Sequence, residues 1–350
     1  MSSIVSLFLE EDIHIKKRPL SQSSLRWLSG LVNQVKSTRQ PTFTKVVVNE
    51  RPIHSHIPRE IQESIHIMKQ PTYCFTTTIY HSTITIFIKG KGYESALDFI
   101  GQWYSFIIPF SKPQCNQSFI VTLYWTPDKK TFPTSKKILD QINVNSAFTF
   151  SCSGNNIGNE IIIFRKEEWK KVLIHESFHL LGLDFSGIKE TISTPILKTM
   201  FRNVEIDDFR LYECYCELWA ELLNIVFLPV NIRNAIQLET EFSIIQWKKI
   251  LTYYGITYEQ LIQTAKYREN TQIISYYGLK SVAWFYLNDY IEMFVIGRTN
   301  PFQFQPTMIE QYVHFFKERY RTREYIDVME QMKAPKNSAL KKTLRISLFG

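Results

Sequence analysis

The eleven residues "HESFHLLGLDF", from His175 to Phe185, constrain this chain more than any other stretch. Histidines four positions apart lie on one face of an α-helix, where both imidazoles can bind a single zinc ion. The glutamate that follows the first histidine can then reach a water on that ion and accept its proton. The spacing therefore predicts His175 and His179 as zinc ligands and Glu176 as a general base, with about one Zn²⁺ per chain.

The sequence around these residues predicts the helix that such a site needs. The stretch "EIIIFR" (160–165) is a short apolar run, as expected of a strand buried on both faces. "KEEWKKVLIHESFHLLG" follows with helical spacing, and Gly182 is a suitable helix terminator. We therefore expect a helix over about 166–182, directly after a buried strand.

Strand and helix patterns also organise the rest of the chain. Residues 1–70 mix short helical stretches with polar loops, and β-branched or aromatic runs from about 72 to 165 predict strands. From 205 onward the apolar residues recur at helical spacing. The predicted fold class is α+β, with an N-terminal mixed segment (1–70), an α+β lobe carrying the active-site helix (71–204) and a mainly helical lobe (205–350).

Residues 140–225 resemble the zincin metallopeptidases through the His-Glu-x-x-His helix and the strand before it. The resemblance implies a mixed sheet and an active-site helix in the N-terminal lobe, with a cleft between this lobe and the helical one. It implies zinc-dependent hydrolysis of peptide bonds in a protein or peptide substrate. It also implies that an edge strand, here residues 146–151, pairs with the extended substrate; an ordinary core strand is the alternative.

A catalytic zinc needs a third protein ligand, and zincin branches differ in its source. The matrix-metalloproteinase-like branch (metzincins) has a histidine three residues after the glycine, where this chain has Phe185. Asp184 is the neighbouring alternative, and Met200 is available for the methionine turn of that branch. His314 is the one histidine that follows His179, and its apolar neighbours "YVHFF" favour a packed core residue over a ligand.

The thermolysin-like branch (gluzincins) takes a glutamate from a downstream helix. A second carboxylate one turn later accepts a hydrogen bond from a zinc-binding histidine. The stretch "ECYCELWAELLN" resembles the Glu-x-x-Ala-Glu arrangement of this branch, which implies Glu217 as the third ligand and Glu221 as the outer acceptor. Two shifted assignments stay open, in which Glu213 or Glu221 is the ligand. Cys214 and Cys216, which flank Glu217, are expected to be small buried packing residues, with metal binding by thiolate as the alternative.

Two further parts of the site follow from the same resemblance. Residues 185–210 are expected to form a loop or a small subdomain beside the cleft. The tetrahedral oxyanion needs a donor besides zinc, and the candidates are Tyr212, Tyr215, Tyr276 and Tyr277.

Competing functions arise from the charge and from the motif. The net charge of +8 suggests a DNA-associated, metzincin-like protease, although no basic motif supports nucleic acid as a partner. A non-enzymatic zincin-fold binding module and a closed structural zinc site also compete with the peptidase. Neither has a chemical need for Glu176, and the sequence therefore favours the peptidase.

Cysteine usage and hydropathy bear on the compartment. Five cysteines, an odd number without a CxxC pair, favour a reducing, intracellular location. The N-terminus lacks the basic region of a signal peptide, and no uncharged apolar run reaches about 18 residues. We expect a soluble, cytoplasmic protein without a membrane partner, and no feature specifies an oligomeric state. Because the composition resembles coding by an AT-rich genome, such as that of a large DNA virus, the compartment could be that of a host cell.

Overall fold

The computed structural model describes residues 3–11, 13–15, 18–47, 51–135, 137–150, 159–188, 191–206 and 208–350. The chain divides into two compact units. The helical unit comprises residues 1–27, 130–144 and 185–349, and the sheet unit comprises residues 28–129, 145–184 and 350. The boundaries predicted at 70/71 and 204/205 do not coincide with this division. Local periodicity predicts where helices and strands lie. It does not predict which unit each element joins, because each unit is built from more than one segment of the chain.

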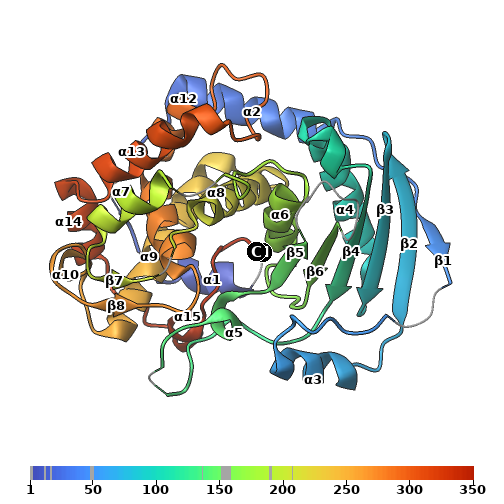
Figure 1. Ribbon diagram of the computed structural model, residues 1–350, viewed down its shortest axis with the longest axis horizontal. Coiled ribbons are helices and arrows are strands. Elements are labelled where there is room, and N and C mark those ends of the chain that lie inside the picture. Colours follow the sequence, from blue (N-terminus) through green and yellow to red (C-terminus); the bar gives the residue numbers. More distant parts are fainter. Residues whose placement is uncertain are drawn as a thin grey trace. The chain divides into compact units, whose positions relative to one another are not determined.

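A mixed six-stranded sheet forms the framework of the sheet unit, in the order β1-β2-β3-β4-β6-β5. Strands β3, β4 and β6 are parallel to one another, and the other pairs are antiparallel. Figure 1 shows this order from β1 at the right-hand edge inward. The strands are β1 (Thr44–Val46), β2 (Thr72–Ile79), β3 (Ser82–Lys89), β4 (Ser118–Tyr124), β5 (Ala147–Phe150) and β6 (Glu160–Ile163).

The strand patterns of the sequence account for most of this sheet. All four residues of β6 are buried, which confirms the prediction of a strand covered on both faces. Strand β1 was missed, because its three residues are exposed and lie in the segment predicted to mix helix and loop. The mixed helix–sheet class is confirmed.

Two helices cover one face of the sheet. The ring of Phe119 on β4 packs against Tyr104 of α4, with ring centroids 4.9 Å apart. Helix α4 is joined to α6 by a buried hydrogen bond from Trp103 Nε1 to Ser177 Oγ (3.0 Å). The helices of this unit are α3 (Arg59–Ile67), α4 (Tyr93–Ile107) and α6 (Trp169–Leu180), with 3-10 turns η1 (Ile108–Phe110) and η2 (Pro113–Cys115).

The opposite face of the sheet holds a half-buried charge pair. Arg51 donates to Glu160 Oε1 (2.6 Å) and to Thr122 Oγ1 (2.8 Å), and its guanidinium lies over the ring of Phe87. The pair attaches the segment around residue 51 to the middle strands of the sheet.

Helix α6, which carries the His-Glu-x-x-His residues, ends in the turn that the sequence predicted. Gly182 has φ +64°, a left-handed conformation that favours glycine. The amide of Leu183 donates to Phe178 O and that of Gly182 to His179 O, the bond pair of a Schellman motif. A Cβ at Gly182 would lie 3.0 Å from Cys115 Sγ. Both backbone conformation and packing therefore require glycine at this helix terminus.

Helices dominate the helical unit, as predicted for the residues after 205. The boundary at 27/28 falls within α2 (Gln22–Lys36). The remaining elements are α1 (Ser3–Leu9), α5 (Gln141–Val144), α7 (Ser193–Met200), α8 (Leu211–Val226), α9 (Ile232–Tyr254), α10 (Tyr258–Gln263), the π-helix η3 (Ile274–Leu279), α11 (Lys280–Phe285), α12 (Leu287–Phe294), η4 (Pro306–Met308), α13 (Ile309–Arg319), α14 (Arg323–Gln331) and α15 (Ser338–Lys342), with the parallel strands β7 (Val204–Glu205) and β8 (Tyr267–Arg268).

The extended segment 343–349 is buried in the helical unit without joining a sheet. Leu344, Ile346 and Leu348 are each at most 3% exposed. The main chain of this segment is bonded at Leu344 by the carbonyl of Lys130 (2.8 Å) and elsewhere by helix side chains. Lys280 donates to Ile346 O (2.8 Å), and Glu239 accepts from the amide of Leu348 (2.9 Å). Buried polar groups of the helices thus satisfy backbone groups that would otherwise be costly to bury.

Cysteines and hydropathy give two facts relevant to the compartment. In the part of the chain that the structure describes, no helix is long and apolar enough to cross a membrane. Cys74, Cys214 and Cys216 are free and buried, whereas Cys115 is disulfide-bonded, and Cys152 lies outside the described residues. The cysteines therefore do not support the prediction of a reducing compartment.

A buried carboxyl group makes the stability of the helical unit depend on pH. Glu269 is 5% exposed and accepts hydrogen bonds from Tyr267 (2.8 Å) and from the amide of Ile274 (3.0 Å). Burial raises the pKa of Glu269 from 4.5 to about 8. A raised pKa means that the folded state holds this proton more tightly than the unfolded state. Its contribution to stability is therefore complete below pH 4.5 and is lost as the pH rises through 8.

Replacement of Glu269 by Gln should remove this pH dependence. Relative to wild type, Glu269→Gln should gain up to roughly 4 kcal/mol of unfolding free energy between pH 5 and pH 8, measured by urea denaturation. The exposed Glu259→Gln variant is the control and should track wild type at both pH values. An equal stability difference for Glu269→Gln at pH 5 and pH 8 would contradict the shifted pKa.

Candidate metal centre

Two histidines on α6 present adjacent ring nitrogens. His175 and His179 lie one helical turn apart, and their Nε2 atoms are 3.1 Å apart. His175 is 5% exposed, and the side chain of His179 is 11% exposed. Helix α6 thus places both predicted ligands on one face, as the spacing of the motif requires.

A carboxylate holds the second of these histidines by its other nitrogen. Asp184 Oδ2 lies 2.5 Å from His179 Nδ1, and the Asp184 side chain is 4% exposed. A carboxylate can only accept, so the proton is on Nδ1 and Nε2 keeps its lone pair for a metal. The left-handed turn at Gly182 brings Asp184 back to the helix, since the residues between His179 and Asp184 close the helix end.

The outer acceptor of His179 was not identified from the sequence. The sequence suggests Asp184 as an alternative ligand and Glu221 as the outer acceptor. Asp184 is a carboxylate that contacts Nδ1 of His179, as an outer acceptor would. The sequence contains one clue to it, a carboxylate two residues beyond the glycine that terminates the helix. For His175, an outer role of Glu221 stays a prediction.

The predicted base is also held in place. Glu176 is 8% exposed, and its Oε2 accepts a hydrogen bond from Thr149 Oγ1 at 2.5 Å. Thr149 belongs to β5, the edge strand predicted to extend over residues 146–151; the strand spans Ala147–Phe150, and residue 151 lies outside the described residues. No pattern in the sequence indicated this contact.

The donor set of α6 fits a zinc ion. Two imidazole nitrogens bound to one zinc at about 2.0–2.1 Å lie about 3.3 Å apart in a tetrahedral site. The observed Nε2 separation of 3.1 Å is close to this value. His175, His179 and Asp184 all belong to groups of side chains that could hold a metal ion. Neutral imidazoles oriented by a carboxylate are typical ligands of zinc in proteins.

Three glutamates follow one face of α8, four residues apart. Glu213, Glu217 and Glu221 are 8%, 3% and 0% exposed. Glu221 forms a buried ion pair with Lys280 Nζ (2.7 Å) and accepts from Trp284 Nε1 (2.5 Å). This ion pair gives Glu221 a structural role within the helical unit that the sequence did not predict. Glu213 is also a member of a group that could hold a metal ion.

Phe185 occupies the position where metzincins have a histidine, and it is a core residue of the helical unit. It is 2% exposed, and its ring centroid lies 4.1 Å from that of Phe304 and 5.7 Å from that of Tyr312. Met200 ends the helix α7 and is buried, so it lies in a helix and not in a turn. Neither residue supports the metzincin alternative.

One histidine prediction was wrong. His314 was expected to be packed in the core, but it is exposed on α13. Tyr312, Val313, Phe315 and Phe316 are buried around it. Four apolar neighbours in sequence therefore indicated a buried face of the helix, while His314 points away from that face.

Within the helical unit, two of the four candidate oxyanion donors bond main-chain carbonyls. Tyr215 donates to Phe302 O (2.8 Å) and Tyr277 to Leu344 O (2.5 Å), and both are buried. Burial raises the pKa of Tyr215 well above its usual value. Tyr212 and Tyr276 are half-buried and stay as candidates.

Both cysteines of α8 are fully buried. Burial raises the pKa of the Cys214 thiol far above its usual range, as expected of a packing residue. Cys216 is a member of a group of side chains that could hold a metal ion, so metal binding by its thiolate stays an alternative. The stretch 185–210 contains α7 and β7, with residues 189–190 and 207 outside the described residues.

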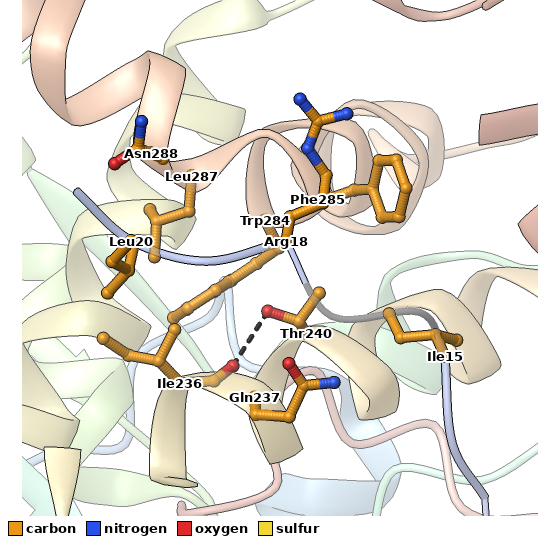
Figure 2. A pocket seen from close by; sticks show the side chains of 10 residues that line it. All are labelled: Ile15, Arg18, Leu20, Ile236, Gln237, Thr240, Trp284, Phe285, Leu287 and Asn288. Atoms are coloured by element: carbon orange, nitrogen blue, oxygen red, sulfur yellow. Dashed lines mark hydrogen bonds between the residues drawn. The ribbon is translucent and has the colours of Figure 1, made fainter. Parts of the chain in front are cut away.

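A small pocket in the helical unit lies outside this candidate centre. It has about 30 Å³ of free volume, which is room for one or two water molecules. Figure 2 shows Arg18 and Trp284 among its lining residues and the bond from Thr240 Oγ1 to Ile236 O. Arg18 pairs with Glu324, so its charge is already compensated. The pocket contains none of the predicted site residues.

The resemblance to zincins stays a prediction. Comparison of the chain with protein-family models, with curated proteins and with solved structures found no match. The sheet unit contains a mixed sheet, a helix with the His-Glu-x-x-His residues and an edge strand.

Loss of the Asp184 carboxylate should weaken metal binding without abolishing it. We expect Asp184→Asn to reduce zinc affinity about 10- to 100-fold, because the amide no longer fixes the tautomer and orientation of His179. Competition with a chromophoric chelator measures this affinity. The exposed Asp98→Asn variant in α4 is the control. An unchanged affinity in Asp184→Asn would show that the hydrogen bond to His179 has no role in metal binding.

Proposed function

We propose that this protein is a zinc-dependent metallopeptidase that hydrolyses peptide bonds in proteins or peptides. The observation that carries the proposal is the pair of Nε2 atoms 3.1 Å apart on α6, with Glu176 beside His175 in the chain. A metal-binding pair without catalysis would have no need for a buried carboxylate next to it. Glu176 is 8% exposed and is oriented by a hydrogen bond, as expected of a general base.

Each site residue of the sheet unit has a defined task in this proposal. His175 and His179 would hold the zinc through Nε2, and Asp184 keeps His179 in the tautomer that can bind it. When bound, zinc would lower the pKa of a coordinated water to about 7 and polarise the substrate carbonyl. Glu176 would accept the proton of the attacking water and later deliver it to the leaving amine.

The third ligand in this proposal is a glutamate of α8. The resemblance to gluzincins favours Glu217, which is 3% exposed. Glu213, one turn earlier, is the rival, supported by its membership of a group that could hold a metal. The cation compensating Glu221 is Lys280, which makes Glu221 the weakest of the three candidates.

Strand β5 would receive the substrate. It is the last strand of the six-stranded sheet and is paired only with β6 among the described strands. An extended peptide can add to such an edge through main-chain hydrogen bonds. Tyr212 or Tyr276 would donate to the oxyanion that forms at the scissile carbonyl.

The first test is metal content. Purified protein should carry about one zinc per chain by mass spectrometry, and His175→Ala or His179→Ala should lose it, since each removes one of three ligands. The exposed His314→Ala variant is the matched control and should keep its zinc. Full zinc occupancy in either variant of α6 would refute the site.

The same measurement identifies the third ligand. Glu217→Gln should lose zinc if the gluzincin assignment holds, and Glu213→Gln should lose it if the assignment is shifted by one turn. Phe185→Ala should leave zinc content unchanged, because the ring is packed in the helical unit. Zinc loss in Asp184→Ala together with full zinc in the Gln variants of Glu213, Glu217 and Glu221 would favour Asp184 as a ligand.

The second test separates catalysis from metal binding. Glu176→Gln should keep its zinc yet lose hydrolysis of fluorescein-labelled casein by about 10²- to 10⁴-fold, because an amide cannot take up the proton. Glu63→Gln, an exposed residue of α3, is the control for an acidic-to-amide change. Zinc-loaded wild type that leaves casein and a mixed peptide library intact would refute the peptidase and favour a binding module.

A further inference from the structure

The contact between Thr149 and Glu176 joins the edge strand to the proposed base. Thr149 Oγ1 lies 2.5 Å from Glu176 Oε2 and 3.4 Å from Glu176 O. A threonine hydroxyl has one proton, and the shorter bond to the carboxylate is the stronger of the two. Both residues belong to the sheet unit, so the contact is internal to one compact part of the chain.

Strand alternation directs Thr149 toward α6. In the pairing of β5 with β6, Thr149 lies opposite Ile161, while Phe148 and Phe150 point to the other face. On that other face the ring of His54 contacts both phenylalanine rings, with centroids 5.3 and 5.0 Å apart. Ring packing on one side and the hydroxyl on the other therefore fix the rotation of β5 about its axis.

We propose that Thr149 is a positioning residue for Glu176: its hydroxyl holds Oε2 and leaves Oε1 to accept the proton of the attacking water. The inference rests on the proposed function. A base must come within about 2.6–3.2 Å of the proton that it removes. A glutamate side chain has three rotatable bonds, and a hydrogen bond to one oxygen restricts the carboxylate to a narrow set of positions. A misplacement of about 1 Å can cost about 100-fold in rate.

The position of Thr149 also links the base to the substrate. The residue that orients Glu176 belongs to β5, whose edge away from β6 would bind the peptide. Any displacement of β5 would move the hydroxyl and, through it, the carboxylate. The base would thus be oriented by the same strand that would bind the substrate.

The experiment compares Thr149→Val, which keeps the β-branched shape but removes the hydroxyl, with Thr149→Ser, which keeps the hydroxyl. We expect Thr149→Val to lower kcat for a quenched fluorescent peptide about 10- to 100-fold, with KM within about twofold of wild type. Zinc content should stay at the wild-type level, and Thr149→Ser should recover kcat to within about threefold. Thr78→Val, an exposed position on β2, is the matched control.

A second readout does not depend on activity. In the metal-free protein, Thr149→Val should lower the melting temperature by a few degrees, about the effect of one hydrogen bond to a charged group. In a Glu176→Ala background the same change should shift it by less than about 1 °C, because its partner is absent.

Three results would overturn the proposal. These are an unchanged kcat in Thr149→Val, a loss of zinc that accompanies the loss of kcat, and equal melting shifts in both backgrounds. A different outcome would separate the two proposals. If the melting shifts of Thr149→Val differ between the two backgrounds as expected, but zinc-loaded wild type hydrolyses no peptide, the contact is structural and the proposed peptidase function fails.

Discussion

The hydrogen bond between His179 and Asp184 is the interaction on which the candidate centre depends. It assigns the proton of His179 to Nδ1 and directs the lone pair of Nε2 toward His175. Without it, either of the two nearly buried imidazoles, whose Nε2 atoms are 3.1 Å apart, could be the hydrogen-bond donor to the other. The carboxylate thereby gives His179 the tautomer that a metal ligand would need.

That bond exists because of how α6 ends. A left-handed glycine lets the chain reverse within two residues, and the Schellman bonds keep the turn rigid. A helix that continued for one more turn would carry Asp184 away from His179. Helix termination, usually considered for its contribution to stability, here determines the surroundings of a ring nitrogen.

Elements whose whole pattern lies in one periodic stretch could be predicted from the sequence. The helical repeat alone placed His175 and His179 on one face of α6, and a continuous apolar run predicted β6. The contact of Asp184 with His179 could be predicted only from the conformation at Gly182. The contact of Thr149 with Glu176 could be predicted only from knowing which strand lies beside β6 and in which register. The ion pair of Glu221 was missed for the same reason, because Lys280 comes from a helix distant in sequence. The spacing of residues within one helix or strand does not reveal which residues the tertiary structure brings to it from elsewhere in the chain.

The antiparallel pairing of β5 has a consequence for how such a chain could change over time. Side chains alternate along a strand, so a slip of one residue exchanges the two faces. A single insertion or deletion in the chain before β5 could turn Phe148 or Phe150 toward α6 and move Thr149 to the side of His54. The polar group beside Glu176 would then be replaced by a hydrocarbon ring, although every strand and helix stayed in place. The length of the chain before β5 is thus constrained by the alternation of side chains along the strand as well as by the fold, since a shift of one residue exchanges the two faces.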